Sequence, residues 1–213
     1  MMTPQEYKDA LMWRYACKKF DPAARIAPAT WDALEEAFHL APSSLGLQLW
    51  HFIVVDDREI REKLCEASFN QTQVRDASKY VVLCARRDVQ DSDLLAHINR
   101  AHEVLNTSEE RMQSAYAKYK GYSVFWQGDE GKSWMESQVH LAAGFVAAAA
   151  ACLHVDTCIM GGIVPVKYDE ILGLENSPYR TVLGMAFGYR SPEDAHALEA
   201  KVRYPKDKVI SHC

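Results

Sequence analysis

The sequence predicts one folded domain in which helices and short apolar strands alternate irregularly. Its 213 residues are 48% hydrophobic and 25% charged, as in globular proteins with one sizeable core. Four short apolar segments have the length and composition of buried strands. No Gly-x-Gly-x-x-Gly motif follows the first of them, which argues against a dinucleotide-binding Rossmann domain. No linker divides residues 1–213, so we expect a single domain.

An opening helix is predicted by a capping box, in which Thr3 and Glu6 satisfy each other's backbone N–H groups, with Pro4 at the first helical position. Apolar residues that recur at intervals of four give this helix one apolar face. They are Tyr7, Leu11 and Tyr15. We therefore expect the helix to extend to about residue 15 and to end before Asp21-Pro22.

The remaining elements follow from the hydrophobic periodicity. Helices are expected at 28–40, 57–67, 132–154 and 168–174, and strands at 49–55, 80–84, 156–160 and 181–189. Residues 91–120 are polar and helical in pattern, which suggests a protruding lobe or a crossing arm. The helix at 132–154 is apolar nearly all round, as is typical of helices buried centrally or at a subunit interface. The tail after Lys201 is expected to be extended.

Charge and composition restrict the function. The net charge of −5 argues against a dedicated nucleic-acid-binding protein. The longest apolar stretch, 141–153, is too short to span a bilayer, and the N-terminus lacks the features of a signal peptide. The six cysteines are scattered without a Cys-x-x-Cys pair, which favours reduced thiols in a cytoplasmic protein. The histidines are too isolated to predict a metal site.

Two segments carry cations that suit an anionic ligand. Arg14 and Lys18 are four residues apart, so both would lie on one face of the opening helix and grip a phosphate. Lys201 and Arg203 are two apart, so in an extended chain their side chains point the same way. The alternatives are cations that stabilise a helix C-terminus and a solvated basic tail.

Three further segments suit the polar edge of a heterocycle. The loop with Pro42, Ser43, Ser44 and Gln48 combines small hydroxyls with an amide. Asn70-Gln71-Thr72-Gln73 is polar and uncharged, and the Met160-Gly161-Gly162 turn follows a strand and exposes backbone N–H groups. Taken singly, each of these segments is also explained as an ordinary loop, cap or turn.

The combination of motifs resembles the FMN-dependent nitroreductase family. Its parts are Arg-x-x-x-Lys-x-Phe-Asp at 14–21, Ala-Pro-Ser-Ser-x-x-x-Gln-x-Trp-His-Phe at 41–52, the Gly161-Gly162 turn and Lys-x-Arg at 201–203. The resemblance covers nearly the whole chain. It implies an α+β fold, with a central mixed β-sheet wrapped by helices in an intertwined homodimer that holds two FMN molecules between its subunits.

The resemblance also implies a function. FMN would be reduced by NADH or NADPH, and a small flat acceptor such as a nitroaromatic or a quinone would then be reduced at the same place by ping-pong hydride transfer. Lys18, as the catalytic residue, would lie near the N1/C2=O side of the flavin ring, where an ammonium stabilises negative charge. An aromatic residue from the cluster Tyr122, Phe125 and Trp126 would cover the ring, unless that cluster is ordinary packing.

Cofactor-binding residues are assigned position by position from the same resemblance. They are Arg14, Tyr15, Ala16, Lys18, Pro42, Ser43, Ser44, Gln48, Asn70, Gln73, Met160, Gly161, Gly162, Lys201 and Arg203. The family often has Ser at Ala16, Lys at Gln73 and Glu at Gly161. These departures leave the preferred nicotinamide and the acceptor open.

Other functions remain compatible with the sequence. One is an enzyme of the same fold that carries out reductive dehalogenation or flavin fragmentation, and another is a non-catalytic flavin-binding dimer. A third is thiol chemistry at Cys17, whose pKa Lys18 would lower.

Overall fold

The centre of the molecule is a four-stranded sheet, seen in a computed structural model that describes residues 2–213. Its strands are β1 (Trp50–Val54), β2 (Lys79–Arg86), β3 (Asp156–Met160) and β4 (Tyr179–Gly188), in the order β1-β2-β4-β3. All three ladders are antiparallel. The expected α+β class is therefore correct, but the expected mixed sheet is not, because neighbouring strands run in opposite directions throughout. Within residues 2–213 the parallel pairing is an isolated bridge between Ala16 and Thr157, outside the four strands.

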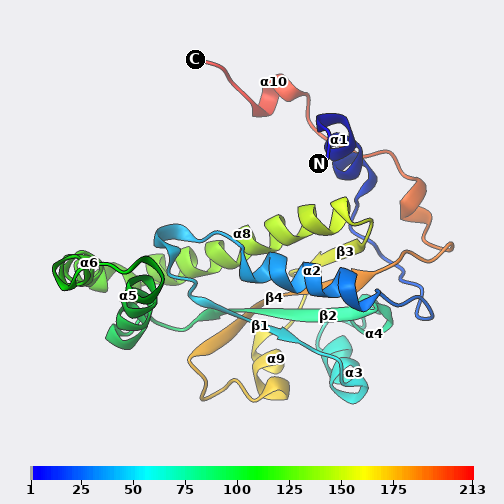
Figure 1. Ribbon diagram of the computed structural model, residues 1–213. Helices are drawn as coiled ribbons and strands as arrows, with labels where there is room; N and C mark the ends of the chain where they lie inside the picture. Colours follow the sequence, from blue (N-terminus) through cyan, green and yellow to red (C-terminus); the bar gives the residue numbers. More distant parts are fainter. Residues whose placement is uncertain (1) are drawn as a thin grey trace.

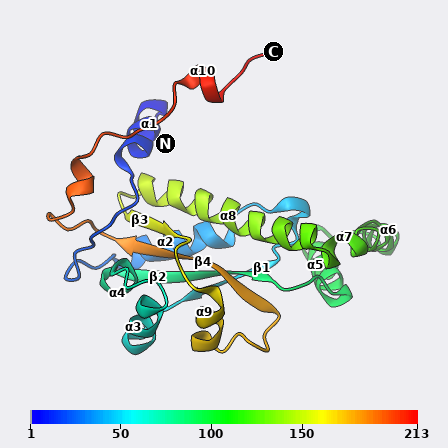
Figure 2. The ribbon, with the colours of Figure 1, turned by 180° about the vertical axis from the view of Figure 1, so that it is seen from behind.

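Helices cover both faces of this sheet (Figure 1, Figure 2). On one face lie α2 (Pro28–His39) and α8 (Asp129–Cys152), and on the other lie α3 (Arg58–Glu66), α4 (Gln73–Asp76) and α9 (Pro165–Leu172). The central strand β2 supplies side chains to both layers in alternation. Val81 and Leu83 join the core under α8, whereas Tyr80 and Val82 join the core under α3 and α9. This two-sided burial explains why the strand is a continuous apolar run.

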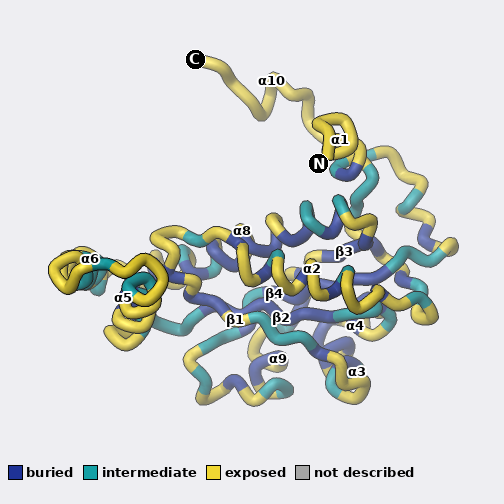
Figure 3. The backbone as a smooth tube through the Cα atoms, in the orientation of Figure 1, coloured by how far each residue is buried: buried dark blue, intermediate teal, exposed yellow. Residues whose placement is uncertain are grey.

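The long helix α8 is buried along one face only. Its inward residues include Met135, Val139 and Val146, which are fully buried. On the opposite face Leu141 and Phe145 are 48% and 42% exposed, and Figure 3 shows exposed positions along this helix. Ala148 and Cys152 continue the same line at helical spacing and are half-buried. We call Leu141, Phe145, Ala148 and Cys152 the open stripe of α8.

A helical lobe projects from one end of the molecule (Figure 1). It comprises α5 (Asp91–Leu105), α6 (Glu109–Lys120) and the short α7 (Ser123–Gln127). The sequence predicted one helical segment here, and the structure confirms a protruding lobe. The segment divides because Asn106 ends α5 in the left-handed conformation with φ = 50°.

The two ends of the chain lie together at the other end of the molecule (Figure 1, Figure 2). Helix α1 (Pro4–Trp13) begins with the expected capping box. It ends before Tyr15, because Arg14 already has extended backbone angles. The C-terminal segment is irregular apart from the short turns η2 (Ala195–Leu198) and α10 (Lys206–Val209). The extended tail is therefore confirmed except for one helical turn.

No helix within residues 2–213 is long and apolar enough to cross a membrane.

Candidate functional site

Residues 14–18 run along the outer edge of the sheet. Ala16 forms a parallel bridge with Thr157 on β3, and the Cys17 N–H donates to the Thr157 carbonyl over 3.1 Å. Because this segment is extended rather than helical, the expectation that Arg14 and Lys18 share a helical face is wrong. They are instead brought to the site by an extended strand-like segment.

The C-terminal segment is fastened to this edge by Asp194, which is 3% exposed. One carboxylate oxygen accepts hydrogen bonds from the Tyr15 hydroxyl at 2.8 Å and from the backbone N–H groups of Lys18 and Lys19 at 2.8 and 3.1 Å. The other oxygen accepts from the His196 N–H at 3.2 Å. These donors hold the pKa of Asp194 at about 2, although burial alone would raise it.

A second carboxylate nearby makes a separate clamp. Asp156, at the start of β3, accepts bidentate hydrogen bonds from the Arg190 guanidinium over 2.6–3.0 Å, and the Arg190 N–H adds another at 2.9 Å. The guanidinium carbon lies 4.3 Å from the ring centre of Trp13 and 4.6 Å from that of Tyr15. Such stacking on aromatic faces is favourable for arginine, so this pair fixes the end of α1 against the sheet.

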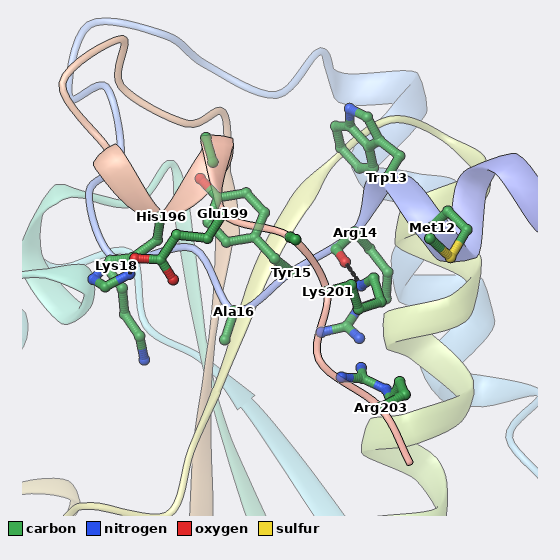
Figure 4. Close-up of a pocket in the computed structure, with 12 residues that line it drawn as sticks. Met12, Trp13, Arg14, Tyr15, Ala16, Lys18, His196, Glu199, Lys201 and Arg203 are labelled. Atoms are coloured by element: carbon green, nitrogen blue, oxygen red, sulfur yellow. Dashed lines mark hydrogen bonds and ion pairs between the residues drawn. The ribbon is translucent and has the colours of Figure 1, made fainter. Parts of the chain in front are cut away.

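These contacts frame an open pocket of about 530 Å³, within the size range of small-molecule sites. Its walls are Met12, Trp13, Arg14, Tyr15, Ala16, Lys18, His196, Ala197, Glu199, Ala200, Lys201 and Arg203. Figure 4 shows the side chains of Arg14, Lys201 and Arg203 close together, with Lys18 on the other side of Ala16. The structure thus brings together six of the predicted cofactor-binding residues, from the two ends of the chain.

The pocket has the charge of an anion site. Within residues 2–213, none of Arg14, Lys18, Lys201 and Arg203 forms an ion pair. Lys201 donates instead to the Arg14 carbonyl oxygen. Burial lowers the pKa of Lys201, and the charges of Arg14 and Arg203 lower it further.

One orphaned donor supports the same conclusion. Among the residues that the structure describes, the buried Nε of Arg14 is one of three buried side-chain atoms without a hydrogen-bond partner. A buried N–H without an acceptor is costly. An anionic ligand bound among these cations would supply acceptors to the arginines that line the pocket.

A second group of predicted residues lies further along the same edge, where β3 ends. The Gln71 side chain donates to the Gly162 carbonyl oxygen over 2.7 Å, which joins the loop at 70–72 to the turn at 161–162. Asn70 is exposed and has φ = 56°. Thr157 and Gly161 are about 13 Å apart along an extended chain. A single elongated ligand on this edge would therefore reach from the cations to this group.

Gln73 and Met160 lie beside this second group but are buried, at 6% and 3% exposure. Met160 packs in the core beneath α3 and α9. Their predicted contact with a cofactor remains a prediction.

The predicted residues Pro42, Ser43, Ser44 and Gln48 lie elsewhere in the chain. The Ser44 N–H donates to the buried Gln138 side chain over 2.8 Å, midway along α8. The cationic pocket, by contrast, adjoins the far end of α8, where Trp13 packs edge-to-face against His154, two residues beyond the helix. Gln138 and Cys152 are roughly 20 Å apart along a helix, so within one chain this loop does not line the cationic pocket. The cluster Tyr122, Phe125 and Trp126 is also remote, because it belongs to the projecting lobe.

Several residues that build the pocket were not predicted. Asp194, Asp156 and Arg190 hold its walls, and His196 and Glu199 line it. In the sequence, Asp194 follows Ser-Pro-Glu in what resembles a surface turn. A single sequence contains no signal that this carboxylate is buried, because Tyr15, Lys18 and Lys19, which donate to it, are 175 or more residues away.

Cys17 does not have the environment of a reactive thiol. Its thiol is fully buried, and burial with nearby Asp156 and Asp194 raises its pKa to about 12. The alternative of thiolate chemistry at Cys17 is therefore wrong, because a thiol with this pKa stays protonated at neutral pH.

Comparisons with known proteins agree with this fold. The model of the Nitroreductase family matches residues 11–189. A Staphylococcus epidermidis protein with the provisional name NAD(P)H nitroreductase is 33% identical, over 95% of this chain and 94% of its own length. The major NAD(P)H-flavin oxidoreductase of Aliivibrio fischeri is 28% identical, over 93% of this chain and 94% of its own length.

A solved structure shows the same architecture. The crystal structure of a provisionally named nitroreductase from Exiguobacterium sibiricum, in complex with FMN, has a TM-score of 0.79. It is 23% identical and covers 100% of this chain and 98% of that chain. The fold and the pocket define an α+β protein with a cation-lined pocket at the edge of its sheet. The family match makes the assignment specific: the chain belongs to the Nitroreductase family.

Proposed function

We propose that this chain binds FMN along the β3 edge and uses it to carry reducing equivalents from NADH or NADPH to small flat acceptors such as nitroaromatics or quinones. The observation that carries the proposal is the convergence on one pocket of four cations that form no ion pair within the described residues 2–213. As a member of its family, the chain is an NAD(P)H-dependent flavin oxidoreductase with FMN as its cofactor.

The donor set of the pocket fits the phosphate of FMN. Two arginines and a lysine supply bidentate and point-charge contacts to phosphate oxygens, and the orphaned Arg14 Nε adds a further donor. Arg14, Lys201 and Arg203 would hold this phosphate. The anion would also relieve the repulsion among these cations, which favours the protonated form of Lys201.

Residues further along the edge suit the ring of the cofactor. Lys18 follows Ala16, which is paired with Thr157, so it lies toward the end of β3 that leads to Gly161. Asn70 and the backbone N–H groups of the 161–162 turn are polar and exposed there. We propose that they hold the pyrimidine side of the ring by hydrogen bonds, and that the Lys18 ammonium stabilises negative charge at that side.

FMN, when bound, supplies the hydride chemistry in both half-reactions. The protein contributes binding, orientation and a fixed positive charge. No side chain has to act as a nucleophile. Because the pocket is open, solvent supplies protons to the acceptor, and donor and acceptor occupy the same face in turn.

We propose that a second copy of the chain completes the cofactor site. The loop with Pro42, Ser43, Ser44 and Gln48 does not line the cationic pocket of its own chain, so we propose that it contributes to the site of a partner in a homodimer. The open stripe of α8 is the surface that would be covered, because exposed apolar stripes on a helix are typical of interfaces. A cytoplasmic location agrees with this function and with the six free cysteines.

Anaerobic reduction of the flavin-loaded protein tests this function. NADH or NADPH should bleach the visible absorbance of the bound flavin, and a nitroaromatic or a quinone should restore it. Bound flavin that neither nicotinamide bleaches would contradict the proposal and indicate a non-catalytic flavin-binding protein. Reoxidation by halogenated substrates alone would indicate a different reaction on the same fold.

A further inference from the structure

Asp194 is a buried carboxylate without a cationic partner. It is 3% exposed, and no ion pair to it is found within residues 2–213. Within the described residues, its negative charge is satisfied by neutral donors: one phenol, the Cys17 thiol and three backbone N–H groups. A buried charge is retained only when such donors replace its lost hydration. This arrangement therefore needs an explanation.

The donors show what the carboxylate joins. Tyr15, Lys18 and Lys19 belong to the extended segment beside β3, whereas Asp194 and His196 belong to the C-terminal segment. Lys201 and Arg203 follow Asp194 by less than ten residues. The same carboxylate thus connects the segment that carries Arg14 and Lys18 with the segment that carries Lys201 and Arg203.

Other contacts also join these two segments: the Ser191 N–H donates to the Lys19 carbonyl oxygen over 2.9 Å, and Phe20 forms an antiparallel bridge with Arg190. Arg190 pairs with Asp156 on β3 and stacks on Trp13 and Tyr15, so it fixes the end of α1. None of these contacts satisfies the Lys18 N–H, which within residues 2–213 donates to the Asp194 carboxylate.

We propose that Asp194 is a positioning residue that sets Lys18 against the flavin ring and holds the two halves of the phosphate pocket in register. It acts through the Lys18 and Lys19 amides and the Tyr15 hydroxyl, without touching the cofactor. This inference rests on the proposed FMN site. The carboxylate is ionised across the physiological range because these same donors stabilise its charged form.

Three variants test the inference by equilibrium titration with FMN. Asp194→Ala removes the acceptor for all of these donors and should weaken FMN binding roughly 10-fold to 100-fold. Asp194→Asn can place its carbonyl oxygen where three of the donors converge, so it should recover at least half of this loss on a logarithmic scale. Tyr15→Phe should weaken binding several-fold in the wild type and not at all when combined with Asp194→Ala.

The matched control is Glu193→Gln, which removes a neighbouring negative charge. Glu193 is exposed and lies 3.7 Å from the Lys19 ammonium. This variant should leave the dissociation constant of FMN within twofold of the wild-type value.

A second readout separates positioning from general stability. If Lys18 is displaced, reduced FMN should lose about tenfold more affinity than oxidised FMN, because reduction adds negative charge near Lys18. For a two-electron couple this corresponds to a midpoint potential about 30 mV more negative in Asp194→Ala. A variant that is merely less stable would bind both forms more weakly by the same factor.

The outcomes distinguish this inference from the proposed function. Wild-type protein that binds no FMN would overturn the proposed function. If the wild type binds FMN, then an unchanged dissociation constant and an unchanged potential in Asp194→Ala would overturn the role of Asp194. An additive effect of Tyr15→Phe on Asp194→Ala would also overturn it.

Discussion

Arg14, Lys201 and Arg203 concentrate positive charge in a pocket where burial, and then the like charges of Arg14 and Arg203, lower the pKa of Lys201. At the scale of single residues, this repulsion is the most informative feature of the molecule. It costs stability in the absence of an anion and is relieved by one. Each cation should therefore have a separable effect on cofactor binding.

Arg203→Ala should weaken FMN binding roughly 10-fold to 100-fold, because it removes a charge-assisted hydrogen bond to the phosphate. Fluorescence titration of the flavin-free protein with FMN measures the effect. Lys206→Ala is the control, since it removes an exposed cation from the same tail outside the pocket. Full flavin retention by Arg203→Ala would contradict the phosphate role of Arg203.

Lys18→Ala should lower the turnover rate more than it lowers FMN affinity, because its ammonium acts on charge that develops at the ring. Steady-state rates at saturating FMN, together with the dissociation constant, separate the two effects. A variant that loses flavin but keeps its normal rate when saturated would assign Lys18 to the phosphate instead.

The free energy of unfolding should depend on pH through the carboxylate of Asp194. Its pKa is lowered to about 2 in the folded chain, whereas an unfolded aspartate titrates near 3.9. Its stabilising effect of about 2 kcal/mol is therefore complete above the unfolded value and is lost as the pH falls toward 2. Between pH 5 and pH 3, we expect the wild type to lose about 1 kcal/mol more free energy of unfolding than Asp194→Asn, by urea titration. Equal losses would show that Asp194 titrates normally.

The cations could be predicted from the sequence because their spacing is local, as in Lys201-Val202-Arg203. Asp194 could not, since its burial depends on donors from the segment at 15–19, which is distant in the chain. The same limit applies to Asp156, whose partner Arg190 is 34 residues away.

At the scale of elements, hydrophobic periodicity predicts the bounds of some helices and strands correctly and of others wrongly. The strand at 156–160 was predicted with its observed bounds, because its length and apolar content match a buried strand. The opening helix was predicted two residues too long, since the spacing of Tyr15 continues the apolar pattern after the helix has ended at Trp13. Tertiary pairing of residue 16 with β3 overrides local periodicity there.

Helix α8 is apolar on nearly all sides, but a single chain covers only one of its faces. Its inner face is covered by the sheet, but Leu141 and Phe145 remain nearly half exposed. A second copy packed on the open stripe would resolve this conflict.

Phe145→Glu should convert the proposed dimer to single chains and should release FMN at the same time, because the loop at 42–48 of the partner would be withdrawn. Size-exclusion chromatography with flavin absorbance measures both effects. The matched control is Val166→Glu, which introduces the same charge at a 68% exposed position of α9 on the opposite layer. A Phe145→Glu protein that remains dimeric would exclude the open stripe as the interface.

In the whole molecule, the main features lie at opposite ends of α8. The helical lobe projects at one end, the cationic pocket and both chain termini lie at the other, and the loop with Ser43 and Ser44 contacts the helix between them (Figure 1). Two copies related by a twofold axis would bring one chain's loop toward the other chain's pocket. This proposed arrangement would account for the separation of the predicted site residues within a single chain.

Sedimentation velocity at the visible absorbance band of the flavin tests the central claim most directly. The purified protein, supplied with FMN, should carry the flavin signal in one boundary with the mass of two chains, and the Arg203→Ala variant should lose that signal to free flavin. A flavin signal that sediments with the mass of one chain, or that never sediments with the protein, would contradict the claim of a shared, cation-lined FMN site.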